Sequence, residues 1–132
     1  GVILKKEIFQ TNKKFLHIHG GYLPKYKGST TNYYSILQEN SLGASAIFMS
    51  EKIDSGPILL RKRFSMSISK LLIDHFYDSY FRAIVLIKTL KKINRNLAKV
   101  SMIQNNQKYD PYFIIHPILK HISILSKNEN TK

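Results

Sequence analysis

The chain has 132 residues and a formal net charge of +13 at pH 7, with 21 lysines and arginines against 8 aspartates and glutamates. This excess favours an anionic partner such as a nucleotide, a polyanionic cofactor or RNA, although compositional bias alone also produces scattered lysines. The absence of cysteine excludes disulfides and thiolate chemistry. No stretch reaches the roughly 18 to 20 apolar residues of a membrane span and no signal-peptide layout is present, so we expect a cytoplasmic protein without a membrane partner.

Hydrophobic periodicity predicts an α/β fold in a single unit, residues 1–132, because this length suffices for one core. Residues 1–10 are typical of the end of one element followed by a short helix. The apolar run 15–19 predicts a buried strand, which ends at a pair of glycines where the backbone can turn. A serine or threonine at 29–31 can cap a helix that continues to about residue 40, and the start of such a helix suits an anion.

The middle of the chain predicts a hairpin and then a long helix. Strands are expected at 44–49 and 58–64, with the loop 50–57 between them too long for a two-residue turn. A helix is expected over 68–94. It is signalled by apolar residues that recur every three or four positions, namely Ile68, Leu72, Phe76, Tyr80, Ala83, Ile87 and Leu90.

The rest of the chain is expected to form a helical extension to this core. Residues 94–108 are a polar connection in which 100–103 fit a short strand, 114–125 fit a second amphipathic helix, and 128–132 fit a frayed tail. We therefore divide the unit into a core at 1–93 and a C-terminal extension at 94–132.

Two histidines and one aspartate form the best candidate for a chemical site. His17 and His19 are two residues apart on a predicted strand, so they share a face, and Asp54 lies in the hairpin loop. Histidine can move protons near neutral pH, and an aspartate can set its tautomer. Neither Ser29 nor Ser55 lies in a nucleophile elbow. This composition favours direct transfer between two bound substrates. A three-ligand metal site and a purely structural pair of histidines remain alternatives.

Other residues could bind a ligand, but structural roles are equally plausible for them. Four tyrosines could stack on a flat ring or pack in the core, namely Tyr22, Tyr26, Tyr33 and Tyr34. Five cations could contact phosphate, although alternation along a strand would leave two of them, Arg61 and Arg63, facing solvent. The other three are Lys25, Lys27 and Lys62. The remaining histidines favour structural roles, namely His75, His116 and His121.

Roughly residues 1 to 65 carry motifs in an order that resembles a known family. His17-Ile18-His19-Gly20-Gly21-Tyr22-Leu23-Pro24 is followed by Tyr26-Lys27-Gly28, Leu42-Gly43-Ala44-Ser45 and Ile53-Asp54-Ser55-Gly56-Pro57-Ile58-Leu59. This order resembles the catalytic domain shared by methionyl-tRNA, phosphoribosylglycinamide and sugar-nucleotide formyltransferases. His17 stands where that family has asparagine, and an asparagine amide always offers a donor whereas an imidazole does so only in the right protonation state.

The resemblance implies the C-terminal part of a three-layer, nucleotide-fold-like domain with a central sheet, a long hairpin and flanking helices. It also implies transfer of a formyl group from N10-formyltetrahydrofolate to a primary amine, without a metal. The implied catalytic residues are His19, Asp54 and His17, and the implied cofactor-binding residues are Asp54, Ile53 and Gly56. The implied substrate-binding residues are Gly20, Gly21, Tyr22, Lys25, Tyr26, Lys27 and Thr30.

The acceptor is expected to be a sugar-nucleotide amine, with methionyl-tRNA as the second choice. In the family, several strands precede the histidine strand, so this chain is expected to be a fragment. An exposed sheet edge in such a fragment would favour a homodimer. An alternative function is a catalytically impaired, basic module that binds nucleic acid or another polyanion.

Overall fold

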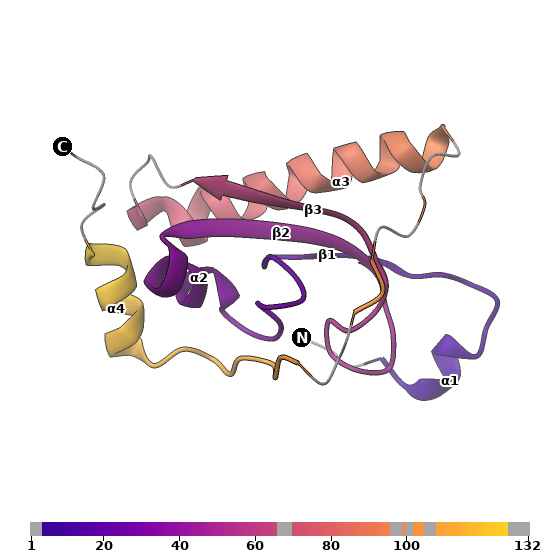
Figure 1. The fold of residues 1–132 in the computed structure, drawn as a ribbon, viewed down its shortest axis with the longest axis horizontal. Helices are drawn as coiled ribbons and strands as arrows, with labels where there is room; N and C mark the ends of the chain where they lie inside the picture. The colour runs from indigo at the N-terminus through magenta and orange to yellow at the C-terminus, as the bar shows by residue number, and fades with distance from the viewer. Residues whose placement is uncertain (1–3, 66–69, 96–98, 100–101, 105–107, 127–132) are drawn as a thin grey trace.

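The computed structural model describes residues 4–65, 70–95, 99, 102–104 and 108–126 (Figure 1). Within these residues the fold is mixed α/β, as the sequence predicts, with one antiparallel sheet of strand order β1-β2-β3 and flanking helices. The strands are β1 (Leu16–His19), β2 (Ser41–Phe48) and β3 (Ile58–Ser65). The α-helices are α1 (Lys6–Phe9), α2 (Thr31–Glu39), α3 (Asp78–Asn94) and α4 (Pro117–Leu125).

The predicted hairpin is present as β2 and β3, which pair from Ser41 opposite Ser65 to Ile47 opposite Ile58. The pairing is irregular between Ala46 and Ile47, next to the loop that carries the candidate aspartate. Both strands extend beyond the predicted ranges at the end away from this loop. The central strand β2 is buried along most of its length because β1 and β3 cover its two edges while other segments cover both faces.

The two faces of the sheet have different covers. On one face, Ala44 and Ala46 of β2 pack against Val85 of α3, and their small side chains leave room for that helix. Figure 1 shows α3 running along this face. On the other face the cover is the loop after β1: the Ser45 hydroxyl donates to the Gly21 carbonyl at 2.7 Å and accepts from the Leu23 amide at 3.0 Å. Alternation along β2 thus separates a helix-packed core from the loop that leads out of the candidate site.

The long helix predicted at 68–94 begins as a 3₁₀ turn (Lys70–Leu72) and a π-helical turn (Ile73–Tyr77) before α3. Its buried residues are not the apolar stripe that signalled it. They recur every four positions, namely Ile73, Tyr77, Phe81, Val85 and Thr89. Most of the signalling stripe is exposed, including Leu72, Phe76, Tyr80, Ile87 and Leu90. Ile68 lies outside the described residues. Both stripes have helical spacing, so only contact with the sheet decides which is buried.

The C-terminal extension returns to the loops around the candidate site. Tyr112 donates its amide to the Lys27 carbonyl and accepts from the Ser29 amide, both at 2.9 Å. In the predicted short strand, Met102 pairs with Ile58, while residues 100–101 lie outside the described part. The predicted helix at 114–125 begins at Pro117, where the ring fits the first helical position. The predicted tail at 128–132 falls outside the described residues. Among the described helices, none is long and apolar enough to span a membrane.

Candidate active site

The two histidines of β1 project to the same face, as the spacing predicts. Their neighbours Leu16 and Ile18 pack in the core beneath α3, which leaves His17 and His19 on the opposite side. The ring centroids of the two histidines are 6.2 Å apart. His19 is buried, with 5% of its surface exposed, whereas the side chain of His17 is 38% exposed. One ring is therefore held inside the protein while the other borders solvent.

The hairpin loop brings Asp54 to both histidines. Its carboxylate Oδ2 lies 3.3 Å from His19 Nδ1, and its Oδ1 lies 3.8 Å from His17 Nε2. Asp54 has a positive φ of 48°, a conformation that aspartate tolerates better than most residues. The Gly28 amide donates to Oδ2 at 2.8 Å, which holds the carboxylate from the side of the loop between β1 and α2. The structure thus brings together all three residues that the sequence analysis selected as a candidate site.

The environment of His19 sets its protonation. Its Nε2 lies 2.7 Å from the Tyr26 carbonyl oxygen, which can only accept, so Nε2 carries the proton. Burial is the main influence on the pKa of His19 and lowers it, outweighing the Asp54 carboxylate, which acts to raise it. A neutral His19 therefore presents the lone pair of Nδ1 toward Asp54 and can take up a proton there.

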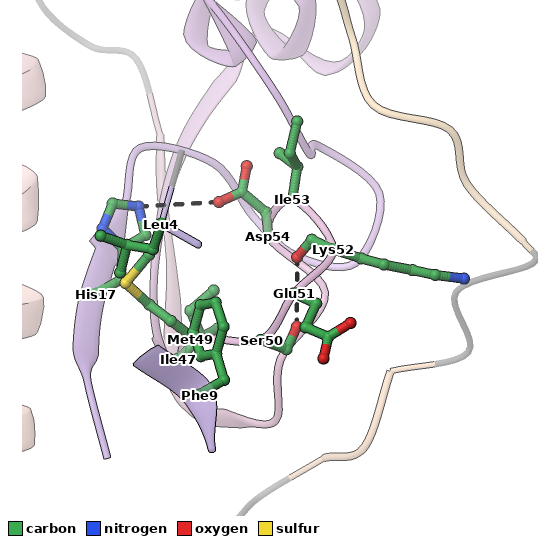
Figure 2. Close-up of a pocket in the computed structure, with 10 residues that line it drawn as sticks. All are labelled: Leu4, Phe9, His17, Ile47, Met49, Ser50, Glu51, Lys52, Ile53 and Asp54. Carbon is green, nitrogen blue, oxygen red and sulfur yellow. Dashed lines mark hydrogen bonds and ion pairs between the residues drawn. The ribbon is translucent and has the colours of Figure 1, made fainter. Parts of the chain in front are cut away.

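Two cavities meet at these side chains. The first is apolar, has a volume of about 200 Å³ and is lined by Phe9, Met49 and the loop residue Ile53. Figure 2 shows the His17 ring and the Asp54 carboxylate turned toward one another beside it. The second has a volume of about 500 Å³ and is mainly polar. His17 and Asp54 line both cavities, so two ligands bound there would approach each other at these residues.

The wall of the larger cavity includes charged residues that the sequence reasoning did not select. Asp78 of α3 accepts from Asn32 at 2.6 Å and pairs with Arg82 at 2.9 Å, and all three line the cavity with Asp74. The spacing of Asp78 and Arg82 predicts a pair on one helix face. The same spacing does not indicate that this helix face borders the histidines, because the orientation of the face depends on how α3 packs on the sheet.

The predicted binding residues divide into two groups. Ile53 lines the smaller cavity and is 51% exposed, while Gly20 and Thr30 line the larger one. Gly21 is buried, and a Cβ there would come within 2.6 Å of His19 Nε2, so its role is to permit the loop to close on the histidine. Gly56 is likewise packed, with the Phe48 carbonyl against the place of a Cβ.

The remaining predicted substrate contacts hold the loop together and do not line either cavity. The Tyr22 ring lies between Arg61 and Arg63, with distances of 4.6 and 4.5 Å from ring centroid to guanidinium carbon. Arg61 also donates to the Leu23 carbonyl at 2.6 Å. Arg61 is half-buried and holds the loop. Arg63 stays exposed, as the alternation predicts, although it also contacts the Tyr22 ring and pairs with Glu39 at 3.1 Å. This arrangement depends on cross-strand packing that the alternation of β3 does not reveal.

Three further members of the predicted set are engaged in the same loop. Lys25 forms an ion pair with Glu39 at 2.7 Å. The Tyr26 ring is buried, and its stacking partner is Tyr112, at a centroid distance of 6.0 Å. Lys27 is buried near Ser55, and this burial lowers its pKa. Their binding roles stay predictions.

Outside the predicted set, Gln104 anchors the aspartate loop. Its amide nitrogen donates to the carbonyl of Asp54 at 2.9 Å and to that of Gly56 at 2.7 Å. The sequence offers no signal for this role, since a glutamine in a polar connection looks like any solvated loop residue. The loop that carries Asp54 is thus held by a side chain that lies 50 residues away in the sequence.

Comparison with known sequences shows which proteins this chain is similar to. The model of the family described as formyl transferase matches residues 1–75. The methionyl-tRNA formyltransferase of Wolbachia pipientis subsp. Culex pipiens is 33% identical over 102 residues, which cover 74% of this chain and 33% of that protein. The enzyme of the same name from Thermodesulfovibrio yellowstonii is 35% identical over 69 residues, or 51% of this chain and 22% of the relative. The chain thus spans about a third or less of the length of these two relatives.

Two solved structures with a fold similar to that of this chain are also formyltransferases. WlaRD, a sugar 3N-formyl transferase crystallised with dTDP and 5-N-formyl-THF, has a TM-score of 0.63 and 29% identity, covering 84% of this chain and 41% of that one. The N-formyltransferase from Helicobacter canadensis, in complex with folinic acid and dTDP-3-aminofucose, has a TM-score of 0.63 and 27% identity, covering 87% and 44% of the two chains.

Proposed function

Because the chain belongs to the formyl transferase family, we propose that its His17–His19–Asp54 site transfers a formyl group from N10-formyltetrahydrofolate to a primary amine. The observation that carries this proposal is the pair of cavities that share His17 and Asp54 as a common wall. A donor on one side and an acceptor on the other would meet at His17 and Asp54, next to His19 in the larger cavity. Such positioning is the main requirement of a direct transfer without a protein nucleophile.

In the proposed reaction the amine nitrogen bonds to the formyl carbon, the bond from that carbon to N10 breaks, and one proton moves from the amine to N10. His19 is suited to carry this proton, since its Nδ1 faces the site while its Nε2 is held by Tyr26. The Asp54 carboxylate stabilises the imidazolium that forms in passing. His17 can donate to the oxygen of the tetrahedral intermediate when its ring nitrogen carries a proton.

The smaller cavity fits the flat ring of the folate. Its apolar wall at Phe9 and Met49 can cover a ring face, and the backbone of the loop 50–54 can bond the ring's polar edge. Its volume of about 200 Å³ suits the ring and not the whole cofactor. Structures similar to this chain were solved with folinic acid and with 5-N-formyl-THF, which supports a formyl-folate donor.

For the acceptor we favour a sugar-nucleotide amine. Residues 29–32, which lead into the N-terminus of α2, line the larger cavity, where that helix end and Arg82 suit a phosphate. Asp74 and Asp78 in the same wall suit an ammonium group. The similar structures with dTDP and dTDP-3-aminofucose support this class. Methionyl-tRNA is the second candidate, favoured by the net charge of +13 and by the names of the sequence relatives.

A direct assay tests both parts. The intact protein should formylate a dTDP-linked amino sugar with N10-formyltetrahydrofolate, detected as a mass increase of the acceptor and release of tetrahydrofolate. Formylation of methionyl-tRNA alone would select the second acceptor. The alternative of a basic binding module predicts no transfer to either acceptor, and an affinity for nucleic acid that falls steeply with salt and is unchanged in His19→Gln.

A further inference from the structure

We propose that His17, His19 and Asp54 form a binding site for a divalent transition-metal ion, for which Zn²⁺ is the natural probe. One ligand atom of each residue lies within 4.8 Å of the other two. The donor set is two imidazoles and one carboxylate, which suits Zn²⁺, Co²⁺ and neighbouring metals better than Mg²⁺ or Ca²⁺. Of the His, Cys, Asp and Glu groups in the described part of the chain, this trio is the one grouped closely enough to hold an ion.

One of the ligand distances already matches that of a tetrahedral metal, and the others are longer. With bonds of about 2.0 to 2.1 Å to nitrogen and oxygen, neighbouring ligand atoms of a tetrahedral zinc lie about 3.3 Å apart. The distance from His19 Nδ1 to Asp54 Oδ2 is 3.3 Å, and that from His17 Nε2 to Asp54 Oδ1 is 3.8 Å. These two distances end on different oxygens of the carboxylate, and the three ligand atoms lie within 4.8 Å of one another, so the more exposed His17 ring has to turn inward to complete the set.

The contacts behind the three ligands are those that metal sites use. The Tyr26 carbonyl binds the Nε2 proton of His19 and so leaves Nδ1 as the coordinating nitrogen. The Gly28 amide holds the Asp54 carboxylate in place at 2.8 Å. With Nε2 protonated, the lone pair of Nδ1 faces a carboxylate oxygen at 3.3 Å. Two acceptors at this distance repel each other unless a proton or a cation lies between them.

The cavities provide access and an open coordination position. His17 and Asp54 border both cavities, so an ion can enter from solvent and keep water as a fourth ligand. His17 supplies the second imidazole at a position where the motif resemblance implies an asparagine. An ion held here would use the nitrogen and oxygen atoms assigned to proton transfer, so it would inhibit the enzyme. This last step rests on the proposed function.

Calorimetric titration of the intact, EDTA-treated protein with Zn²⁺ tests the site. We expect one ion per chain with a Kd below about 10 µM, a threshold that separates a three-ligand site from casual surface binding. His17→Asn should weaken binding by about 100-fold, because it removes a direct ligand and not merely a supporting contact. His121→Asn is the matched control, since His121 is exposed on α4, and it should bind as the unmodified protein does. Equal affinity in His17→Asn, or no saturable binding below about 100 µM, would overturn the proposal.

Cobalt provides a readout that does not depend on activity. Four-coordinate Co²⁺ at this site should give visible absorption that is lost in His17→Asn and retained in His121→Asn; a spectrum unchanged by His17→Asn would place the ion elsewhere. In the formylation assay, Zn²⁺ should inhibit at the concentration that fills the site, and EDTA should restore the rate. Undiminished transfer with the site filled would refute inhibition. An enzyme inactive with or without Zn²⁺ would count against the proposed function alone, because titration and spectrum report binding directly.

Discussion

The Nε2 atom of His19 donates to the carbonyl oxygen of Tyr26 at 2.7 Å, which ties the end of β1 to the loop seven residues later. This bond orients the ring, selects its tautomer and leaves Nδ1 toward Asp54. Tyr26 therefore contributes to the site through its backbone, while its side chain is buried between α2 and the C-terminal segment.

His19→Gln should separate the chemical role of this residue from its structural role. A glutamine amide can still donate to the Tyr26 carbonyl, but it cannot accept and release a proton. We expect formyl transfer to fall about 10²- to 10⁴-fold with little change in melting temperature. His19→Ala should lose the same activity and also about 1 to 3 kcal/mol of stability, because the buried carbonyl loses its donor. Unchanged turnover in His19→Gln would contradict the assigned role.

Asp54→Asn removes the negative charge of the carboxylate and keeps the shape of the side chain. Asparagine accepts a positive φ and can still accept the Gly28 amide bond, so the loop should fold as before. The charge that stabilises the protonated His19 is lost, and kcat should fall by at least about 100-fold. Asp54→Ala should be less stable than Asp54→Asn by about 1 kcal/mol, since alanine is strained at this φ. Equal denaturation midpoints for the two variants would refute the strain argument.

His17→Asn should keep or raise the rate of formyl transfer when metal ions are chelated. An asparagine amide always offers a donor to the developing oxyanion, whereas a neutral imidazole offers one only in one of its tautomers. The comparison is kcat in EDTA for the unmodified protein, His17→Asn and His17→Leu, the last of which lacks any donor and should be slower. Complete loss of activity in His17→Asn would mean that the histidine has a role of its own in catalysis.

Gly56→Ala should destabilise the fold by about 3 kcal/mol, because a Cβ there would overlap the Phe48 carbonyl oxygen, which is backbone and cannot move aside. Gly20→Ala is the control. Its Cβ would meet the ends of the Arg82 and Asp78 side chains at 2.6 Å, and these can shift at a cost below about 1 kcal/mol. Melting temperatures of the two variants measure the difference. Equal losses would show that the aspartate loop is not packed as described.

Alkaline pH should weaken the contact between α2 and the π-helical turn. Burial, and then the hydrogen bond to Asp74, raise the pKa of Tyr33 to about 12. The folded state therefore holds this proton more tightly than the unfolded chain, whose tyrosine pKa is about 10. The contribution is complete below pH 10 and is lost as the pH rises toward 12.

Tyr33→Phe provides the comparison for this pH dependence. By pH 11.5 the unmodified protein should lose about 1 to 2 kcal/mol relative to Tyr33→Phe, compared with the difference at pH 8.5. Urea unfolding at the two pH values measures it, and the titrations of lysines other than Lys120, which interacts with Tyr33, are common to both proteins and cancel. A stability difference that does not change between the two pH values would contradict the assigned cause.

The local parts of the site were accessible from the sequence because they depend on neighbours in the chain. His17 and His19 are two positions apart on a strand, which places them on one face, and the hairpin loop brings Asp54 close to them. The same reasoning failed for the helix after the hairpin, where two apolar stripes share one period and the exposed stripe gave the stronger signal.

The sequence by itself determined the mixed α/β class, the hairpin, the shared face of the histidines and the order of motifs that resembles the formyltransferases. Only the tertiary structure decided that the Tyr26 carbonyl holds His19, that Gln104 anchors the Asp54 loop, and that α3 turns Asp78 and Arg82 toward the larger cavity. The physical reason is the distance along the chain over which each kind of interaction acts. Alternation and turn chemistry act over a few residues, whereas these contacts join distant segments whose approach is set by how α3 and the C-terminal segment pack on the sheet.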